Sequence, residues 1–255
     1  GGWTNGALIG EAHSRGLTTD RGSRGKPFYL RNRLGKTLAW SRGSTTFNSA
    51  LSKKTALHKD VSSRLLMAHS IPATENNVFS GGEAERAWAW AAQLGELVVK
   101  PATGSQGRDV HVRIGDRDRF LEAFSDVAEK WRGRVLVEKF YEGVEHRCLV
   151  VDGSLVGATR RRPASIVGDG SLSVGELVAE KNRSRGRVHK RIVIDERVVL
   201  FLESQELTIN SVPGEGERVY LRAESNLHQG GDAIDATDAL PMEAVAVAEK
   251  VARAI

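Results

Sequence analysis

Lys100 and the glycines after it have the residue types of a phosphate-binding loop. The apolar segment 96–101 is typical of a short strand, and a small loop with Gly104 and Gly107 follows it. Glycines let backbone N–H groups approach phosphate oxygens closely, and a lysine at the end of the strand adds positive charge. An ordinary glycine turn has the same composition. The loop by itself therefore leaves both interpretations open.

A second candidate group stands at the end of a later strand, where Glu138, Lys139 and Phe140 are followed by Glu145. The edge of a strand can present backbone groups to an adenine, and a carboxylate can accept hydrogen bonds from ribose hydroxyls. These residues therefore suit a bound nucleotide. The alternative for Glu145 is a surface ion pair with Arg147.

Three consecutive arginines, Arg160, Arg161 and Arg162, precede the turn-forming segment 167–170. Adjacent like charges on a strand are costly unless an anion meets them. Successive side chains of a strand point to opposite faces, so Arg161 should face away from the other two. An anion would therefore meet one face of this strand, and we expect Arg160 and Arg162 to be solvated or peripheral.

The sequence does not match several common catalytic motifs. Segment 35–37 (Gly-Lys-Thr) ends like a P-loop, but Leu30 stands where that motif requires glycine. Gly168 and Gly170 are not continued into a dinucleotide-binding fingerprint. The seven histidines lack the H-x-x-x-H spacing, and the single Cys148 cannot complete a zinc site. The hydrolase, zinc-enzyme and Rossmann interpretations therefore lose their main support, and Cys148 is expected to be a small core residue.

The elements that must position these residues come from a chain of 255 residues, which is longer than the usual single domain. Hydrophobic residues make up 40% and charged residues 27%, enough apolar material for a core. No apolar run approaches the roughly 20 residues that cross a bilayer, and no secretory signal is visible. With one cysteine and no internal disulfide, we predict a two-lobed cytoplasmic protein without a membrane partner.

The formal net charge is +5, which permits nucleic-acid binding but also suits a pocket for a polyphosphate. Aromatic residues are only 6%, which argues against a single-strand stacking platform. The basic runs near 21–42 and 183–191 have the simpler interpretation of solvated loops. We therefore predict no nucleic-acid partner.

Apolar periodicity predicts helices that alternate with strands linked by hairpins, which is an α+β class. Residues 1–50 show little periodicity and are expected to be loops with a strand or two. Asp152 and Gly153 form a dipeptide favoured in tight hairpin turns. The expected helices cover 52–69, 83–94, 116–131, 174–181, 196–205 and 243–254. The expected strands cover 96–101, 110–114, 134–140, 146–151, 155–161 and 218–223.

Taken together, several motifs resemble those of the ATP-grasp ligases, above all cyanophycin synthetases and the ATP-grasp half of bifunctional glutathione synthetases. The resemblance runs from about Lys54 to the C-terminus. The motifs that carry it, in the order of that family, are Leu97-Val-Val-Lys-Pro, Arg161-Arg-Pro-Ala, Gly168-Asp-Gly, Glu176-Leu-Val with Asn182, and the stretch from Arg222 through Asn226 and Gly230-Gly231 to Asp238.

This resemblance implies an ATP-grasp fold, two α+β lobes with the nucleotide held between them. Residues 1–50 would be the remnant of a preceding N-terminal domain, 51–138 the N-lobe with its phosphate-loop lid, and 139–255 the C-lobe. The chain begins without Met and stops in what is typical of a helix interior, so we expect a fragment whose C-lobe is incomplete.

Nine nucleotide-binding residues are implied. Lys59 and Lys100 would contact ATP phosphates under the glycine loop, the residues after Val137 would hold the adenine, and Glu145 the ribose. Lys59 could instead be a solvated helix lysine. The nine residues are Lys59, Lys100, Gly104, Ser105, Gly107, Glu138, Lys139, Phe140 and Glu145.

The implied catalytic residues are Arg161 and Arg222, which would face the transferring phosphoryl group or an acyl phosphate, where positive charge stabilises developing oxyanions. Asn226 with Gly230 and Gly231 would line the acceptor side. Asp235 and Asp238, outside these roles, are expected to be structural caps in a turn-rich segment.

The implied cofactors are ATP and Mg²⁺. The metal ligands of the family would lie beyond residue 255, so no metal-binding residue is assigned. The resemblance predicts a carboxylate–amine ligase that joins amino acids or small peptides through an acyl phosphate, and relatives commonly form homo-oligomers. The departures His58 and Pro241 leave an alternative, a nucleotide-binding scaffold or regulator of the same fold without turnover.

Overall fold

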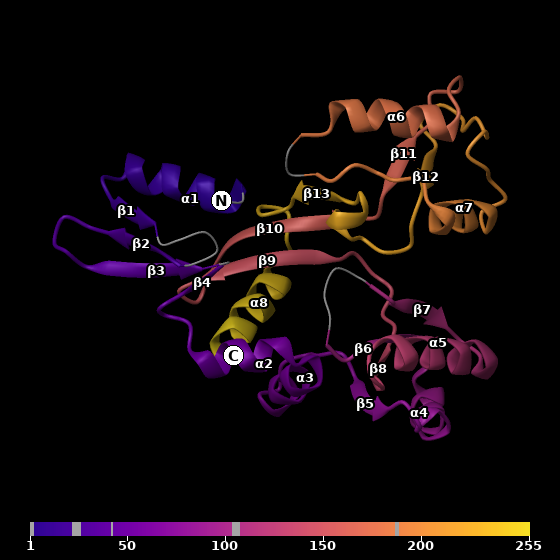
Figure 1. Cartoon of the computed structure of the whole chain (residues 1–255), viewed down its shortest axis with the longest axis horizontal. Helices are drawn as coiled ribbons and strands as arrows, with labels where there is room; N and C mark the ends of the chain where they lie inside the picture. Colours follow the sequence, from indigo (N-terminus) through magenta and orange to yellow (C-terminus); the bar gives the residue numbers. More distant parts are fainter. Residues whose placement is uncertain (1–2, 22–26, 42, 104–107, 187–188) are drawn as a thin grey trace. The chain divides into compact units, whose positions relative to one another are not determined.

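The computed structural model describes residues 3–21, 27–41, 43–103, 108–186 and 189–255 (Figure 1). It divides into two compact units, residues 1–56 and 57–255. Among the described residues every strand pairing is antiparallel, and helices pack on the sheets, so the predicted α+β class is confirmed. None of the described helices has the length and apolar character needed to span a membrane.

The first unit has more structure than the sequence predicted. Helix α1 (Trp3–Ser14) precedes a sheet with the strand order β1-β2-β3-β4. Ile9 and Ala12 of α1 pack on Phe28 and Leu30 of β2. Helix α1 contains two glycines, and its apolar residues do not gather on one helical face, so the sequence shows no helical periodicity. Packing against the sheet therefore stabilises this helix. The strands are β1 (Thr18–Arg21), β2 (Phe28–Arg31), β3 (Thr37–Ser41) and β4 (Ser44–Thr45).

The single helix predicted over 52–69 is wrong. Helix α2 (Ala50–Leu57) ends at the unit boundary, and α3 (Lys59–Ala68) starts after His58. His58 has extended backbone angles, φ −103° and ψ 98°, which no helical residue adopts. Apolar spacing continues across His58, so the pattern alone could not reveal the break.

A four-stranded sheet with the order β5-β8-β6-β7 carries the first candidate residues. Helices α4 and α5 pack on one face, where Leu97, Val99, Val135 and Val137 are fully buried. Of the helix predicted over 83–94, the structure forms α4 with Ala87 and Ala91 buried, whereas Ala92 is exposed at the start of a 3-10 turn. The elements are β5 (Asn76–Ser80), α4 (Ala84–Ala91), η1 (Ala92–Leu94), β6 (Leu97–Pro101), β7 (His111–Ile114), α5 (Arg117–Lys130) and β8 (Arg134–Lys139).

Helix α5 begins where the sequence predicted. Asp116 accepts a hydrogen bond from the Arg119 N–H at 2.9 Å and so caps the helix. Phe120 and Phe124 are fully buried against the sheet. The cap and the inward-facing stripe together give α5 one stable orientation on the sheet.

A long hairpin of β9 and β10 belongs to a second sheet with the order β13-β10-β9, in which β10 is the central strand. Asp152 and Gly153 both have positive φ, 50° and 74°, as the predicted tight turn requires. Helix α8 packs on this hairpin, and the Arg253 guanidinium donates to the Gly153 carbonyl at 2.9 Å. The elements are β9 (His146–Val151), β10 (Ser154–Arg162), β13 (Asp232–Asp235) and α8 (Met242–Ala254).

Strands β11 and β12 pair and are covered by α6 and α7 around a separate core that includes Ile166, Val198 and Leu221. Gly168 precedes α6 in a very close backbone approach, because a Cβ there would lie 2.2 Å from the Gly214 carbonyl oxygen. Gly168 of the 168–170 motif therefore has a packing role. The elements are β11 (Ser165–Val167), α6 (Val174–Ser184), α7 (Glu196–Glu203), β12 (Arg218–Tyr220) and η2 (Leu227–Gln229).

Candidate functional site

Lys59, Lys100 and Glu138 form one charged cluster. Lys100 and Glu138 lie on the face of the β5-β8-β6-β7 sheet opposite α4 and α5, and their side chains form an ion pair. Both side chains are largely buried, 17% and 15% exposed. Lys59 comes from the first turn of α3. Two ammonium groups therefore share the neighbourhood of one carboxylate.

Burial and the two neighbouring charges shift the pKa of Lys59. Burial lowers the pKa of the Lys59 ammonium below its ordinary value, and the charge of Lys100 lowers it further, while Glu138 opposes the shift. A lowered lysine pKa means that the folded protein disfavours the second positive charge. A negative charge brought close to Lys59 would therefore favour its charged form.

Lys139 and Phe140 close the end of strand β8. Their N–H groups donate to the carbonyls of Glu75 at 3.0 Å and Glu96 at 2.7 Å, respectively. The Arg113 guanidinium carbon lies 4.8 Å from the centroid of the Phe140 ring, within cation–π range. Both predicted residues therefore have a fixed backbone, and Phe140 presents an aromatic ring beside a cation.

A cavity of about 430 Å³ brings together predicted residues that are far apart in the sequence. Phe140, Glu145 and Arg161 all line it. Arg160 and Arg162, which we expected to be solvated or peripheral, border the same cavity. Arg160 is exposed and Arg162 is half-buried, so the expectation is compatible with their positions at the end of β10.

Glu145 and Arg161 are joined by a backbone hydrogen bond, and their side-chain charges attract each other. The Glu145 carboxylate accepts a hydrogen bond from the Ser225 hydroxyl. The backbone carbonyl of Glu145 accepts one from the Arg161 N–H at 2.7 Å. Within the described ranges no ion pair joins Glu145 to Arg147, the alternative partner. Burial and the nearby charge of Arg147 lower the pKa of the Arg161 guanidinium, and Glu145 opposes this. Arg161 therefore also sits where an additional negative charge would be favourable.

Arg222 is buried, 6% exposed. It does not itself line that cavity, although its neighbours Ala223 and Glu224 do. Its Nη2 donates to Asp195 Oδ2 at 2.6 Å, and its Nε has no hydrogen-bond partner among the described residues. It lines a second cavity of about 380 Å³ with Val110 and Phe201. Sequence reasoning missed Asp195, although a carboxylate just before the apolar run of α7 is a helix-cap signal.

Asn226, Gly230 and Gly231 form a tight turn. Asn226 Oδ1 accepts from the His228 N–H at 2.9 Å, and the Asn226 carbonyl accepts from the Gly231 N–H at 3.0 Å. Gly230 has φ +92°, a conformation that favours glycine. A Cβ on Gly231 would lie 2.8 Å from the Arg162 carbonyl oxygen, so the turn is wedged against the end of β10.

Three predicted residues, Gly104, Ser105 and Gly107, lie outside the described residues, and their role in a phosphate loop stays a prediction. Asp235 accepts hydrogen bonds from the Thr237 N–H and hydroxyl, so its expected capping role is confirmed. Across the described part of the chain, no group of three or more His, Cys, Asp and Glu side chains could hold a metal ion.

Comparisons with known proteins identify relatives by sequence and by fold. No family model matches the sequence. Cyanophycin synthetase from Crocosphaera subtropica is 39% identical over 166 residues, which are 62% of this chain and 19% of that protein. Cyanophycin synthetase from a Nostoc species is 34% identical over 207 residues, 78% of this chain and 23% of that protein. The glutathione biosynthesis bifunctional protein of Clostridium perfringens is 35% identical over 167 residues, 63% of this chain and 22% of that protein.

Among solved structures, a bifunctional glutathione synthetase from Pasteurella multocida superimposes with a TM-score of 0.68 and 28% identity, covering 97% of this chain and 34% of that one. The predicted resemblance and the fold are therefore confirmed. The chain spans about a fifth of the length of the curated relatives that it matches.

Proposed function

Because this chain is a homologue of ATP-grasp ligases and has their fold, we propose that it is the nucleotide-binding part of an ATP-dependent carboxylate–amine ligase. In the proposed reaction a substrate carboxylate attacks the γ-phosphate of ATP and forms an acyl phosphate. An amine then displaces phosphate through a tetrahedral intermediate, and ADP is released. Activation is needed because a free carboxylate has no competent leaving group.

The observation that carries this proposal is the cluster of Lys59, Lys100 and Glu138. Burial and the charge of Lys100 lower the pKa of the Lys59 ammonium, and Glu138, which is ion-paired with Lys100, opposes the shift. A triphosphate would bring negative charge beside both ammonium groups and form charge-assisted hydrogen bonds. The residues present therefore fit ATP.

The arginine-lined cavity supports the chemical step. Arg161, with Arg160 and Arg162 beside it, offers fixed positive charge where phosphoryl oxygens would gain negative charge. Phe140 offers an aromatic ring for the adenine, and Glu145 offers carboxylate oxygens for the ribose hydroxyls. Holding both reactants in one place removes much of the entropic cost of their meeting.

Mg²⁺ would neutralise phosphate charge and polarise the γ-phosphoryl group when bound. Among the described residues no group of three or more His, Cys, Asp and Glu side chains could hold it. We therefore assign the metal ion no ligand in the described part of the chain.

The proposed substrates are amino acids or short peptides, joined by a peptide or γ-glutamyl-type amide bond. The relatives are named for cyanophycin and for glutathione, which supports this class but does not choose the pair. A cytoplasmic location, the absence of a nucleic-acid partner and a homo-oligomeric state stay predictions.

The test is ADP release by the intact protein with MgATP and pooled amino acids, followed by mass spectrometry of the mixture. We expect ADP only when amino acids are present, together with a new condensed mass. AMP in place of ADP would contradict the acyl-phosphate route. ATP binding without amino-acid-dependent turnover would favour the alternative, a nucleotide-binding scaffold. The exposed His58, which makes no side-chain cap bond, is one feature that motivates this alternative.

A further inference from the structure

The buried guanidinium of Arg222 leaves part of its hydrogen-bonding capacity unused. Its side chain is 7% exposed, and its Nη2 donates to Asp195 Oδ2 at 2.6 Å. Nε is buried without a partner, and Nη1 donates to no residue in the described ranges. A guanidinium carries five N–H donors in a rigid fork. Because buried donors without acceptors cost free energy, an anion that reached Nη1 would stabilise this side chain.

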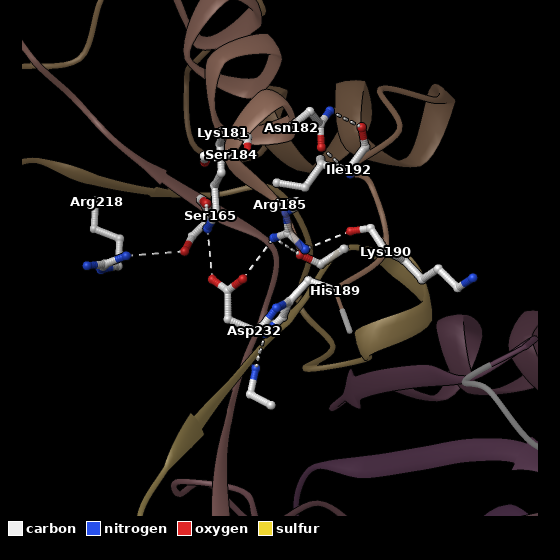
Figure 2. A network of polar contacts seen from close by, with 12 residues as sticks. Ser165, Lys181, Asn182, Ser184, Arg185, His189, Lys190, Ile192, Arg218 and Asp232 are labelled. Carbon is white, nitrogen blue, oxygen red and sulfur yellow. Dashed lines mark hydrogen bonds and ion pairs between the residues drawn. The ribbon is translucent and has the colours of Figure 1, made fainter. Parts of the chain in front are cut away.

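A second buried arginine shows what a structural role requires. Arg185 follows α6, and its side chain is 5% exposed. Its Nη1 donates to the Lys190 carbonyl at 2.7 Å, and its Nη2 donates to the Gly230 carbonyl at 2.6 Å and to Asp232 Oδ1 at 2.8 Å (Figure 2). Its Nε has no acceptor, as in Arg222. Arg185 thus uses both terminal nitrogens within the protein, whereas Arg222 lines a cavity and leaves Nη1 unused among the described residues.

The 380 Å³ cavity beside Arg222 has an apolar wall. Val110 contributes from the segment before β7, and Leu200 and Phe201 contribute from α7. Leu200 is 58% exposed, so much of its apolar surface faces solvent. A ligand with an apolar group would gain free energy by covering this wall. The volume is near the lower end of the roughly 300–1,000 Å³ that small-molecule pockets occupy, which favours a small ligand.

Most charged side chains around this cavity already have partners. His111 Nε2 lies 3.0 Å from Asp126 Oδ2. Arg197 Nη2 lies 4.0 Å from Asp109 Oδ1. Asp109 Oδ2 also accepts a hydrogen bond from the indole N–H of Trp131 at 2.8 Å. These groups therefore compensate one another and are less available to a ligand than Arg222.

Glu224 is the acidic side chain of the cavity that has no such partner. It is half-buried, and its carboxylate accepts no hydrogen bond and forms no ion pair within the described part of the chain. It lines the 380 Å³ cavity together with Arg222. One small molecule with a carboxylate and an ammonium group would match both side chains.

We propose that this cavity binds a free α-amino acid with an apolar side chain, which is the amine substrate of the proposed ligase. The α-carboxylate would accept hydrogen bonds from Arg222, and the α-ammonium group would pair with Glu224. The apolar side chain would lie against Leu200 and Phe201. This inference rests on the proposed function and names a substrate class for it.

The two cavities give the bound amino acid a direction. Arg222 lines the 380 Å³ cavity alone, whereas Glu224 also lines the 430 Å³ cavity that contains Arg161. The carboxylate would therefore lie away from the nucleotide, and the amine would face it. Amide formation needs the amine nitrogen close to the acyl carbon. This direction suits the attacking amine and not the carboxylate that is phosphorylated.

The binding test uses L-leucine and two analogues that each lack one charged group. Leucinamide lacks the carboxylate, and 4-methylpentanoate lacks the ammonium group. Each is titrated by calorimetry into the intact protein at pH 7 without ATP. We expect L-leucine to bind about tenfold or more tightly than either analogue, because each charged hydrogen bond would be lost separately. L-glutamine, which is similar in size but polar, should bind about fivefold or more weakly than L-leucine.

Two variants locate the charged groups. Glu224→Gln should weaken L-leucine binding about tenfold and leave 4-methylpentanoate binding within about twofold. Arg222→Met should weaken both of these ligands and leave leucinamide binding within about twofold. Arg191→Met is the matched control and should change none of the affinities, because Arg191 is exposed and lines none of the described cavities. If Arg222→Met does not fold, Glu224→Gln decides.

The proposal is overturned if L-leucine does not bind saturably, or if Glu224→Gln weakens L-leucine and 4-methylpentanoate equally. Equal affinity for L-glutamine and L-leucine would overturn the apolar assignment. In turnover, tandem mass spectrometry should place leucine at the carboxyl end of the product, and leucine at the amino end would overturn the direction. Failure of the proposed function is distinguishable, because it appears as absent ADP release with every amino acid, whereas the binding pattern is measured without ATP.

Discussion

The guanidinium of Arg222 and the carboxylate of Asp195 are joined by a hydrogen bond of 2.6 Å, and the same carboxylate caps helix α7 by accepting from the Val198 N–H at 3.1 Å. Burial by itself would raise the pKa of the Asp195 carboxyl. The hydrogen bonds from Arg222 and from Val198 outweigh burial and hold the pKa below its ordinary value. Asp195 thus remains ionised and orients the buried Arg222.

Replacing Asp195 should separate its two roles. Asp195→Asn keeps an N-cap but loses the charge, and Asp195→Ala loses both. We expect the free energy of unfolding at pH 7 to fall by about 1.5–3 kcal/mol in Asp195→Asn and by about 1 kcal/mol more in Asp195→Ala. Chemical denaturation measures both values. Equal stability of Asp195→Asn and the wild type would mean that the pair adds nothing to the fold.

The pH dependence of that difference has a definite sign. The folded pKa of Asp195 is lower than its unfolded value, so the ionised carboxylate stabilises the fold above the unfolded pKa of about 3.9. This contribution is lost as the pH falls through the folded pKa. The stability difference between wild type and Asp195→Asn should therefore be constant near neutral pH and shrink below about pH 4. A difference that grows in acid would contradict the assigned direction.

Lys100→Met should weaken ATP binding while the fold persists. The substitution keeps the aliphatic stem in place and removes the charge that would meet phosphate. Charged hydrogen bonds contribute about 1.5–3 kcal/mol, which corresponds to about 10- to 150-fold in affinity. Titration calorimetry measures the loss, and exposed Lys250 on α8, changed to Met, is the control. Unaltered ATP affinity in folded Lys100→Met would place the phosphate site elsewhere.

Amine labelling should detect the electrostatics of Lys59. Because its pKa is lowered by burial and by Lys100, the pH midpoint of its acylation should lie below that of exposed Lys250. Removing the Lys100 charge in Lys100→Met should move the Lys59 midpoint upward, and saturating ATP should slow the labelling of Lys59 alone. Peptide mass spectrometry follows both lysines in one sample. Identical midpoints for the two lysines would refute the charged cluster.

Gly168→Ala should destabilise the region around α6. A Cβ at this position would lie 2.2 Å from the Gly214 carbonyl oxygen, so the backbone must move. We expect a loss of about 1–3 kcal/mol in the free energy of unfolding. Gly82→Ala is the matched control, since a Cβ at Gly82 would have no heavy atom within 4 Å. If both variants unfold alike, the close approach is not the reason for the glycine.

Local patterns in the sequence determined the elements whose signals are contained within a few residues. The helix predicted from 116 and the turn at Asp152 and Gly153 are both as predicted, because capping, periodicity and turn geometry act over one or two turns of chain. The resemblance of the ordered motifs also identified Phe140, Glu145 and Arg161, which share one cavity.

Tertiary structure decided what depends on distant partners. Helix α1 is stabilised by packing against β2. The short strands β11 and β13 are recognisable only by their pairing with β12 and β10, respectively. The pairs Asp195 with Arg222 and Arg185 with Asp232 join residues that no local pattern connects. Such contacts form when packing brings buried charges together, and because a buried charge must be compensated, the folded environment selects the partner.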